Sequence, residues 1–251
     1  MQHQARKRFG QNFLEDASVI DHIVEVIAPE RRLHLLEIGP GRGALTYPLM
    51  ARSKDLNVIE IDRDLAAVLR TRESPTFHVT EGNVLHLDLH HFPTPLTVVG
   101  NLPYNISTPL IFHLFQYKDQ IDEMIFMLQK EVVERMAAQP SCKEYGRLSV
   151  MTQYFCEVEP LFLVPPNAFS PAPKVDSMLV SLRPWKISPY PTLSIEAFGR
   201  FAEVVQLAFN QRRKTLKNAL SSLKMNVGEP FAHQRAEELS VADFLALALI
   251  K

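Results

Sequence analysis

The feature that most constrains the fold of this chain is a buried-strand pattern that runs directly into a glycine loop and then a helix. The apolar segment Leu33–Ile38 is followed by Gly39-Pro40-Gly41-Arg42-Gly43, and a predicted helix opens at Ala44-Leu45-Thr46. Glycines allow a tight turn and a close approach of the backbone to a ligand above a helix amino terminus. This order predicts an α/β fold with a ligand at the loop.

A second predicted strand ends in an acidic residue. Glu60 closes this strand and stands 21 positions after Gly39. A carboxylate at such a place can accept hydrogen bonds from both hydroxyls of a ribose. The loop spacing is GxGxG rather than GxGxxG, and no plausible hydride-site His or Lys stands out, which disfavours a nicotinamide-dependent oxidoreductase. We therefore predict a nucleoside-binding site.

Predicted strands and helices alternate through the following part of the chain. Strands are expected at 77–80, 97–100 and 124–128, and helices at 17–28 (capped by Asp16), after a cap at Ser107, and at 130–138. Two further strands, 161–166 and 177–182, are expected to close the sheet as an antiparallel pair. The alternation predicts a parallel, doubly wound sheet.

The apolar run Val98-Val99 ends at Gly100 and is followed by Asn101-Leu102-Pro103-Tyr104. The proline fixes its own φ and biases the preceding residue away from helix. The Asn101 oxygen and a carbonyl of Leu102 or Pro103 can then act as two acceptors, with the Tyr104 ring as a stacking surface. Such a set suits a planar ring with an exocyclic amine, such as adenine. The alternative is an ordinary strand-to-loop turn.

Two other positions are candidates with an equally good structural explanation. Asn83 follows the strand at 77–80 and can reach the edge of an adenine, or it can be an ordinary turn residue. Phe169 lies in a loop that Pro171 and Pro173 stiffen, so it is either a second stacking surface or a packing residue.

The last third of the chain has a different character. A proline-rich segment around Trp185 is the predicted linker, and only helical periodicity follows it, which predicts domains at 1–184 and 185–251. The last helix is expected after Ser240, in a capping box with Asp243. Between Ser170 and Gly228 there are nine Lys or Arg against three Asp or Glu. Four of the nine form a dense cluster that we expect to contact phosphates rather than merely form a solvated face: Arg212, Arg213, Lys214 and Lys217.

Composition limits the class of protein. The chain has 251 residues, of which 46% are hydrophobic and 22% charged, with a formal net charge of -1. A net charge so close to zero argues against binding of nucleic acid over the whole protein surface, so any contact with nucleic acid must come from local basic patches. The two cysteines, Cys142 and Cys156, have no metal-site spacing and fit a reducing compartment. No membrane-spanning run, signal peptide or lipidation motif stands out, and we expect a cytoplasmic protein.

Six motifs occur in order along nearly the whole chain: Phe9-Gly10-Gln11-Asn12-Phe13-Leu14, Leu36-Glu37-Ile38-Gly39-Pro40-Gly41-Arg42-Gly43, Ile59-Glu60-Ile61-Asp62, Asn101-Leu102-Pro103-Tyr104, Phe169-Ser170-Pro171-Ala172-Pro173-Lys174-Val175-Asp176-Ser177 and Arg212-Arg213-Lys214-Thr215-Leu216-Lys217-Asn218. Together these motifs resemble the ribosomal RNA adenine N6-methyltransferase family, specifically its bacterial small-subunit (16S) dimethyltransferase branch. The Arg212-Arg213-Lys214 run resembles that branch, because the large-subunit enzymes that share the catalytic motif usually lack it.

The resemblance implies a Rossmann-like class I methyltransferase sheet with a small C-terminal all-helical domain. It implies S-adenosylmethionine as the methyl donor, S-adenosylhomocysteine as the product, no metal, and a monomer that binds no membrane. The acceptors would be N6 of two adjacent adenines near the 3′ end of 16S rRNA, within the small ribosomal subunit or its late precursor. Residues 1–184 would bind the cofactor and catalyse, and 185–251 would bind rRNA.

The resemblance also assigns residues. It implies Asn101, Tyr104 and Phe169 as catalytic, and Arg212, Arg213, Lys214 and Lys217 as RNA-binding. The cofactor residues would be Asn12, Leu14, Gly39, Glu60, Asn83 and Asn101. The family usually has Asp where this chain has Asn83, so the hydrogen bond to the cofactor adenine would lose its charge assistance. The alternatives are a large-subunit or other adenine-N6 methyltransferase, and a ribosome-assembly or RNA-binding factor in which methyl transfer is secondary.

Overall fold

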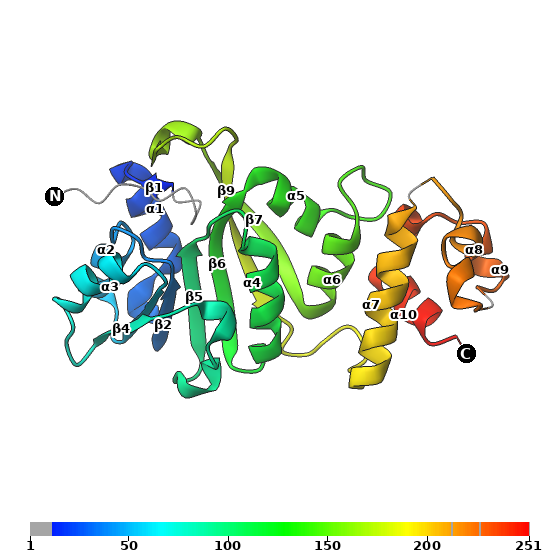
Figure 1. Cartoon of the computed structure of the whole chain (residues 1–251), viewed down its shortest axis with the longest axis horizontal. Coiled ribbons are helices and arrows are strands. Elements are labelled where there is room, and N and C mark those ends of the chain that lie inside the picture. Colours follow the sequence, from blue (N-terminus) through cyan, green and yellow to red (C-terminus); the bar gives the residue numbers. More distant parts are fainter. Residues whose placement is uncertain (1–11, 212, 226, 251) are drawn as a thin grey trace. The chain divides into compact units, whose positions relative to one another are not determined.

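The computed structural model describes residues 12–211, 213–225 and 227–250 (Figure 1). Contacts divide the chain into two compact units, Met1–Lys130 with Glu159–Pro184 and Glu131–Val158 with Trp185–Lys251. Residues 131–158 thus cluster with the C-terminal helices. The assignment of catalysis to 1–184 and of RNA binding to 185–251 stays a prediction.

The first unit is built on a seven-stranded sheet of order β4-β3-β2-β5-β6-β9-β7. Neighbours from β4 to β6 pair in parallel, and β9 pairs with β6 in antiparallel fashion, in keeping with the predicted doubly wound sheet. The two closing strands are neighbours, as expected, with β9 lying between β6 and β7. The strands are β2 (His34–Ile38), β3 (Leu56–Glu60), β4 (Phe77–Glu81), β5 (Leu96–Asn101), β6 (Ile121–Gln129), β7 (Cys156–Val164) and β9 (Ser177–Pro184).

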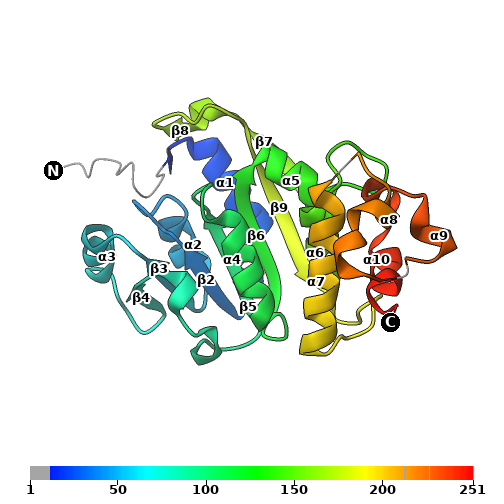
Figure 2. The same ribbon diagram turned by 45° about the vertical axis from the view of Figure 1, so that its right-hand side comes forward.

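Helices cover both faces of this sheet. Successive side chains of a strand point to opposite faces, so both faces carry apolar side chains that the helices bury. Val99 of β5 and Ile125 of β6 belong to a buried core cluster that also contains residues of α1 (Ala17–Ile27), α2 (Thr46–Arg52) and α3 (Arg63–Arg70). In Figures 1 and 2, α4 (Ser107–Leu114) stands in front of the sheet, and its side chains Leu110, Ile111 and Leu114 are buried.

The helix termini show which local predictions hold. Asp16 caps α1, its carboxylate accepting the N–H of Ser18 at 2.9 Å and of Val19 at 3.2 Å. The expected cap at Ser107 is wrong, because Ile106 precedes α4 and the Ser107 hydroxyl instead donates to the Tyr104 carbonyl at 3.1 Å. That bond supports the loop that follows β5.

A separate two-stranded sheet joins the N-terminal segment to a distant loop. In it, β1 (Phe13–Leu14) pairs antiparallel with β8 (Phe169–Ser170), so that Leu14 lies opposite Phe169. The Glu15 N–H donates to the Ala168 carbonyl at 2.8 Å and extends the pairing. Phe13 is 7% and Leu14 4% exposed, so the apolar side chains of this strand pack against the protein.

The second unit is mostly helical. In its core, the aromatic rings of Tyr154, Phe198 and Phe201 pack against one another. The buried Tyr145 hydroxyl donates to the Leu239 carbonyl at 2.8 Å and ties residues 131–158 to the C-terminal helices. The helices of this part are α5 (Lys130–Ala137), α6 (Arg147–Phe155), α7 (Ile195–Asn210), α8 (Leu216–Ala219), α9 (Glu229–Ala232) and α10 (Val241–Ala248).

The last helix begins as the sequence predicts. Ser240 is its N-cap, its hydroxyl oxygen accepts the Asp243 N–H, and the Asp243 carboxylate accepts the Ser240 N–H at 2.9 Å. Within the described residues, no helix is long and apolar enough to cross a membrane.

Candidate active site

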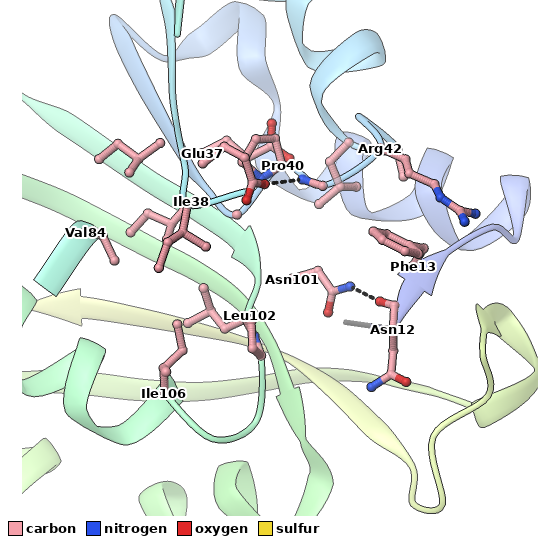
Figure 3. Close-up of a pocket in the computed structure, with 18 of the residues that line it drawn as sticks. Asn12, Phe13, Glu37, Ile38, Pro40, Arg42, Val84, Asn101, Leu102 and Ile106 are labelled. Carbon is pink, nitrogen blue, oxygen red and sulfur yellow. Dashed lines mark hydrogen bonds between the residues drawn. The ribbon is translucent and has the colours of Figure 1, made fainter. Parts of the chain in front are cut away.

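The carboxyl ends of four neighbouring strands and the N-terminal segment line a cavity of about 280 Å³ in the first unit. An open α/β sheet binds its ligands at this edge. Figure 3 shows the apolar side chains of Ile38, Val84, Leu102 and Ile106 across the cavity from Phe13 and Arg42. Of the residues predicted for cofactor binding and catalysis, seven line it: Asn12, Leu14, Gly39, Glu60, Asn83, Asn101 and Tyr104.

Glu60 joins the acidic strand end to the glycine loop. Its Oε2 accepts the Gly41 N–H at 2.9 Å and its Oε1 accepts the Asp62 N–H at 2.8 Å. Burial raises the pKa of this carboxyl, while the two backbone donors act against the shift. Each carboxylate oxygen has a second lone pair for a further donor, such as a ribose hydroxyl. The structure therefore brings together the two motifs whose meeting the sequence predicts.

Glu37 is a second buried acid of the cavity, and sequence reasoning missed it. It lies on β2, is 2% exposed, and accepts a hydrogen bond from the Thr46 hydroxyl at 2.7 Å. Burial, with a smaller contribution from Glu60, raises the pKa of Glu37 to about 8. The signal that could have found it is an acid in the middle of the apolar pattern Leu33–Ile38.

Asn101 ends β5 with its amide in a defined orientation. Its Nδ2 donates to the Asn12 backbone carbonyl at 3.1 Å, as Figure 3 shows. A carbonyl can only accept, so it requires the NH₂ end of the amide, and Oδ1 is directed elsewhere. The glycine before it is also required, because a Cβ at Gly100 would lie 2.5 Å from the Ile38 carbonyl oxygen.

Tyr104 is held at its hydroxyl and presents its ring. The hydroxyl is 2.9 Å from the Oγ of the buried Ser177 at the start of β9. Burial raises the pKa of Tyr104, so the phenol is neutral at neutral pH. In the same loop the Pro103 carbonyl accepts the Ile106 N–H at 3.1 Å. This favours the Leu102 carbonyl as the second acceptor beside Asn101.

Asn83 has a local partner for its oxygen. Its Oδ1 accepts the Leu85 N–H at 3.1 Å and caps the short 3-10 turn Val84–His86. This is the oxygen expected to accept a hydrogen from the adenine amine, and it already accepts one hydrogen bond from the backbone. The NH₂ group of Asn83 can only donate, so it cannot take over that role. Its role toward the cofactor stays a prediction.

Phe169 lies apart from the other predicted residues. It is 5% exposed, belongs to the buried core cluster, and is not among the residues that line the cavity. Its role as a second stacking surface stays a prediction. Besides Tyr104, the aromatic ring of Phe13 lines the cavity, with the Arg42 guanidinium 4.2 Å above its centroid. Sequence reasoning did not single out this pair.

Of the predicted phosphate-binding residues, Arg213 and Lys214 lie between α7 and α8 in the second unit, and Lys217 lies in α8. Arg213, Lys214 and Lys217 are exposed, and Arg212 lies outside the described residues. The Leu216 N–H donates to the Gln234 carbonyl at 2.8 Å and fixes the start of α8. Contact with phosphates stays a prediction.

Comparison with known proteins decides the family. The family described as ribosomal RNA adenine dimethylase matches residues 2–250. The chain belongs to this family. It is 50% identical over 258 residues to the ribosomal RNA small subunit methyltransferase A of Psychromonas ingrahamii, covering 98% of this chain and 93% of that protein. The protein of the same name from Haemophilus ducreyi is 50% identical over 263 residues, covering 98% and 89%.

Solved structures of similar proteins agree with the fold. A dimethyladenosine transferase from Plasmodium falciparum has a TM-score of 0.77 at 26% identity, covering 94% of this chain and 95% of that one. The 23S rRNA methyltransferase ErmE has a TM-score of 0.67 at 27% identity, covering 94% and 99%. The predicted Rossmann-like methyltransferase fold and the predicted enzyme class, an rRNA adenine dimethyltransferase, are confirmed.

Proposed function

We propose that this protein transfers methyl groups from S-adenosylmethionine to N6 of two adjacent adenines near the 3′ end of 16S rRNA. The acceptor would be the small ribosomal subunit or its late precursor, and the product N6,N6-dimethyladenosine. Relatives named small subunit methyltransferase A, about half identical over nearly the whole chain, support this choice of substrate. The observation that carries the proposal is the amide of Asn101, which a hydrogen bond to Asn12 orients in a cavity that Glu60 also lines.

The residues present fit S-adenosylmethionine. Glu60 offers acceptors for ribose hydroxyls, and the side of the cavity with Ile38 and Val84 offers an apolar surface for a planar base. The Glu60 carboxylate suits a ligand that carries positive charge. When bound, S-adenosylmethionine supplies an electrophilic methyl group. Asn12, Leu14, Gly39 and Asn83 would complete this site.

The chain's own contribution to the chemistry is orientation of the acceptor amine. An adenine amine is a poor nucleophile because its lone pair is delocalised into the ring. The Asn101 Oδ1 and the Leu102 carbonyl would accept both N–H hydrogens and favour a pyramidal nitrogen. Positioning and electrostatics then dominate the rate. The methylated amine is acidic enough to release its proton to solvent, so no general base is required.

The target adenine must leave its stack before it can enter the site. The Tyr104 ring would stack on the flipped base, an interaction worth about 1–3 kcal/mol. The hydroxyl of this residue contacts Ser177, so it fixes the ring rather than touching the acceptor. Phe169 would need to turn out of the core to take part.

The test is transfer of radiolabelled methyl groups to under-methylated small subunits, followed by identification of the modified nucleotides. We expect dimethyladenosine at two adjacent positions. Asn101→Ala should reduce the single-turnover rate by about 10²–10³, the usual loss for one preorganised polar contact to a reacting group, with nearly normal cofactor affinity. Tyr104→Ala should be severely impaired and Tyr104→Phe mildly. Label found only in large-subunit RNA would support the alternative methyltransferase.

A second candidate is a ribosome-assembly factor in which methyl transfer is secondary. The exposed basic residues Arg213, Lys214 and Lys217 favour it, because they can bind RNA without catalysis. An Asn101→Ala protein that still binds RNA separates the two functions, since only an assembly factor would keep its cellular role. The cytoplasmic location and the monomeric state also stay predictions, and sedimentation of the pure protein tests the latter.

A further inference from the structure

We propose that the backbone carbonyl of Asn12, held by the pairing of β1 with β8, orients the catalytic amide of Asn101. This inference rests on the proposed function, in which the Asn101 oxygen accepts a hydrogen from the target amine. It gives the N-terminal segment a part in methyl transfer that is separate from cofactor binding.

The Asn101 amide donates a hydrogen bond to a backbone carbonyl of the N-terminal segment. Asn101 Nδ2 lies 3.1 Å from the Asn12 carbonyl oxygen, although the two residues are 89 positions apart in sequence. An amide has a donor end and an acceptor end of nearly the same shape, so sterics alone would not choose between its two orientations. Because the Asn12 carbonyl accepts only, it selects the orientation that leaves Oδ1 available to the substrate.

The pairing of β1 with β8 holds the Asn12 carbonyl in place. Asn12 directly precedes β1, where Phe13 lies opposite Ser170 and Leu14 opposite Phe169. The N–H groups of Glu15 and Asp16 both point to the Ala168 carbonyl, at 2.8 and 3.3 Å. The side chains of Phe13 and Leu14 are buried beneath this pairing. The carbonyl is therefore part of an anchored strand rather than of a free end.

The reversed orientation of the Asn101 amide would lose hydrogen bonds at both of its ends. With the amide reversed, its NH₂ group would meet the N–H hydrogens of the acceptor amine, and its oxygen would meet the Asn12 carbonyl. Both contacts would pair like with like, which loses two hydrogen bonds and leaves buried polar groups unsatisfied. The Asn12 carbonyl thus removes a competing state that would bind RNA but could not react.

Asn101→Asp is the substitution that tests this arrangement. An ionised carboxylate has no donor for the Asn12 carbonyl, whereas a protonated carboxyl has one donor and one acceptor, like the amide. The other charged or titratable side chains that line the cavity are Glu37 on β2, Glu60 on β3, Arg42 in the glycine loop and Tyr104. Their own titration is present in the unsubstituted protein, which serves as the reference at every pH.

The first arm measures hydrogen–deuterium exchange of residues 13–16 in the full chain without cofactor, from pH 6 to pH 9. For Asn101→Asp we expect protection of this segment to fall as the pH rises, relative to the unsubstituted protein. Asn105→Asp is the matched control, because it adds the same charge at an exposed residue lining the same cavity. Protection that Asn101→Asp leaves unchanged at every pH would overturn the inference.

The second arm measures the single-turnover methylation rate of under-methylated small subunits at saturating cofactor. Relative to the unsubstituted protein, Asn101→Asp should gain activity as the pH falls, by about tenfold for each pH unit above the pKa of the new carboxyl. Asn101→Ala should stay slow at every pH, and the saturating cofactor keeps any change in the cofactor Kd of either variant out of the measured rate. A relative rate for Asn101→Asp that is constant or rises with pH would refute the orienting role.

The two arms separate this inference from the proposed function. If the unsubstituted protein methylates no small-subunit adenine, the proposed function fails, and the exchange arm alone decides whether Asn12 holds the Asn101 side chain. If methylation occurs but the exchange of residues 13–16 ignores Asn101→Asp, the proposed function stands and this inference fails.

Discussion

Two buried acids of the cavity differ in the partners that their carboxyl groups have. Glu60 accepts two backbone N–H groups, whereas Glu37 accepts a single hydroxyl hydrogen from Thr46. Backbone donors stabilise the ionised form directly, and a lone hydroxyl does so less. The expected roles differ accordingly, with Glu60 as an ionised acceptor for the ligand and Glu37 as a group that holds a proton when the cavity is empty.

Glu60→Ala should weaken the binding of S-adenosylhomocysteine by at least tenfold. The loss corresponds to one charge-assisted hydrogen bond, worth about 1.5–3 kcal/mol. Titration calorimetry gives the affinity, and a thermal-unfolding curve of the variant shows whether it folds. An unchanged Kd in a folded Glu60→Ala protein would remove this residue from the ribose site.

Glu37→Gln should change the dependence of stability on pH. Since the folded-state pKa of about 8 lies above the ordinary 4.5, the folded protein keeps a proton that the unfolded chain releases in this window. Stability of the unsubstituted protein should therefore fall as the pH rises from about 5 to about 8. Glutamine keeps an acceptor for Thr46 and does not titrate. Over the same pH range the free energy of unfolding of the variant should therefore fall less than that of the unsubstituted protein, by about 2–5 kcal/mol. Urea unfolding at pH 5 and pH 8.5 measures the difference, and parallel losses would contradict it.

At the scale of elements, the site depends on how closely β5 approaches β2. A Cβ at Gly100 would meet the Ile38 carbonyl oxygen at 2.5 Å, and a backbone atom inside a sheet cannot move aside as a flexible side chain can. Gly100 therefore sets the distance between the two strands that carry Asn101 and the glycine loop.

Gly100→Ala should destabilise the protein by about 1–3 kcal/mol, the usual cost of overpacking. It should also lower methyl transfer more than cofactor affinity, because it displaces Asn101. Gly199→Ala is the matched control. That glycine lies in α7 with no atom near its added Cβ, so its replacement should stabilise the helix by about 0.5–1 kcal/mol. Chemical denaturation compares the two, and equal effects would refute the close-approach explanation.

Long elements were predictable and very short ones were not. The apolar runs of β2 and β5 and the helical pattern of α1 are long enough to reveal these elements, and the sequence distance between Gly39 and Glu60 predicted their meeting. The strands β1 and β8 have two residues each, too few for any periodicity, and pair across more than half of the chain. The Asn12–Asn101 contact depends on that pairing and could not be read from either motif.

At the scale of the whole molecule, a net charge of -1 leaves RNA affinity to local clusters. Neutralising Arg213, Lys214 and Lys217 together should reduce the slope of log affinity against log salt by about 2, since each phosphate contact contributes about 0.7–0.9. Cofactor affinity should not change.

The control for this cluster removes the same charge elsewhere. Arg31, Lys54 and Arg63 are exposed residues of the first unit, and their neutralisation should leave the salt slope nearly intact. Filter binding of small-subunit rRNA over a range of salt concentrations measures both triple variants. If the two triple variants had the same slope of log affinity against log salt, the basic residues at 213–217 would be ordinary solvent-exposed charges that do not contact phosphates.

The position of β9 has a consequence for how this chain is made. The strand ends at Pro184 and lies between β6 and β7, both of which precede it in sequence. During synthesis, β6 therefore leaves the ribosome with one edge unpaired until more than fifty further residues have followed. An open edge of this kind is a template for pairing with other chains. Fragments that stop before Ser177 should accordingly collect in aggregates, whereas chains extended past Pro184 should stay dispersed.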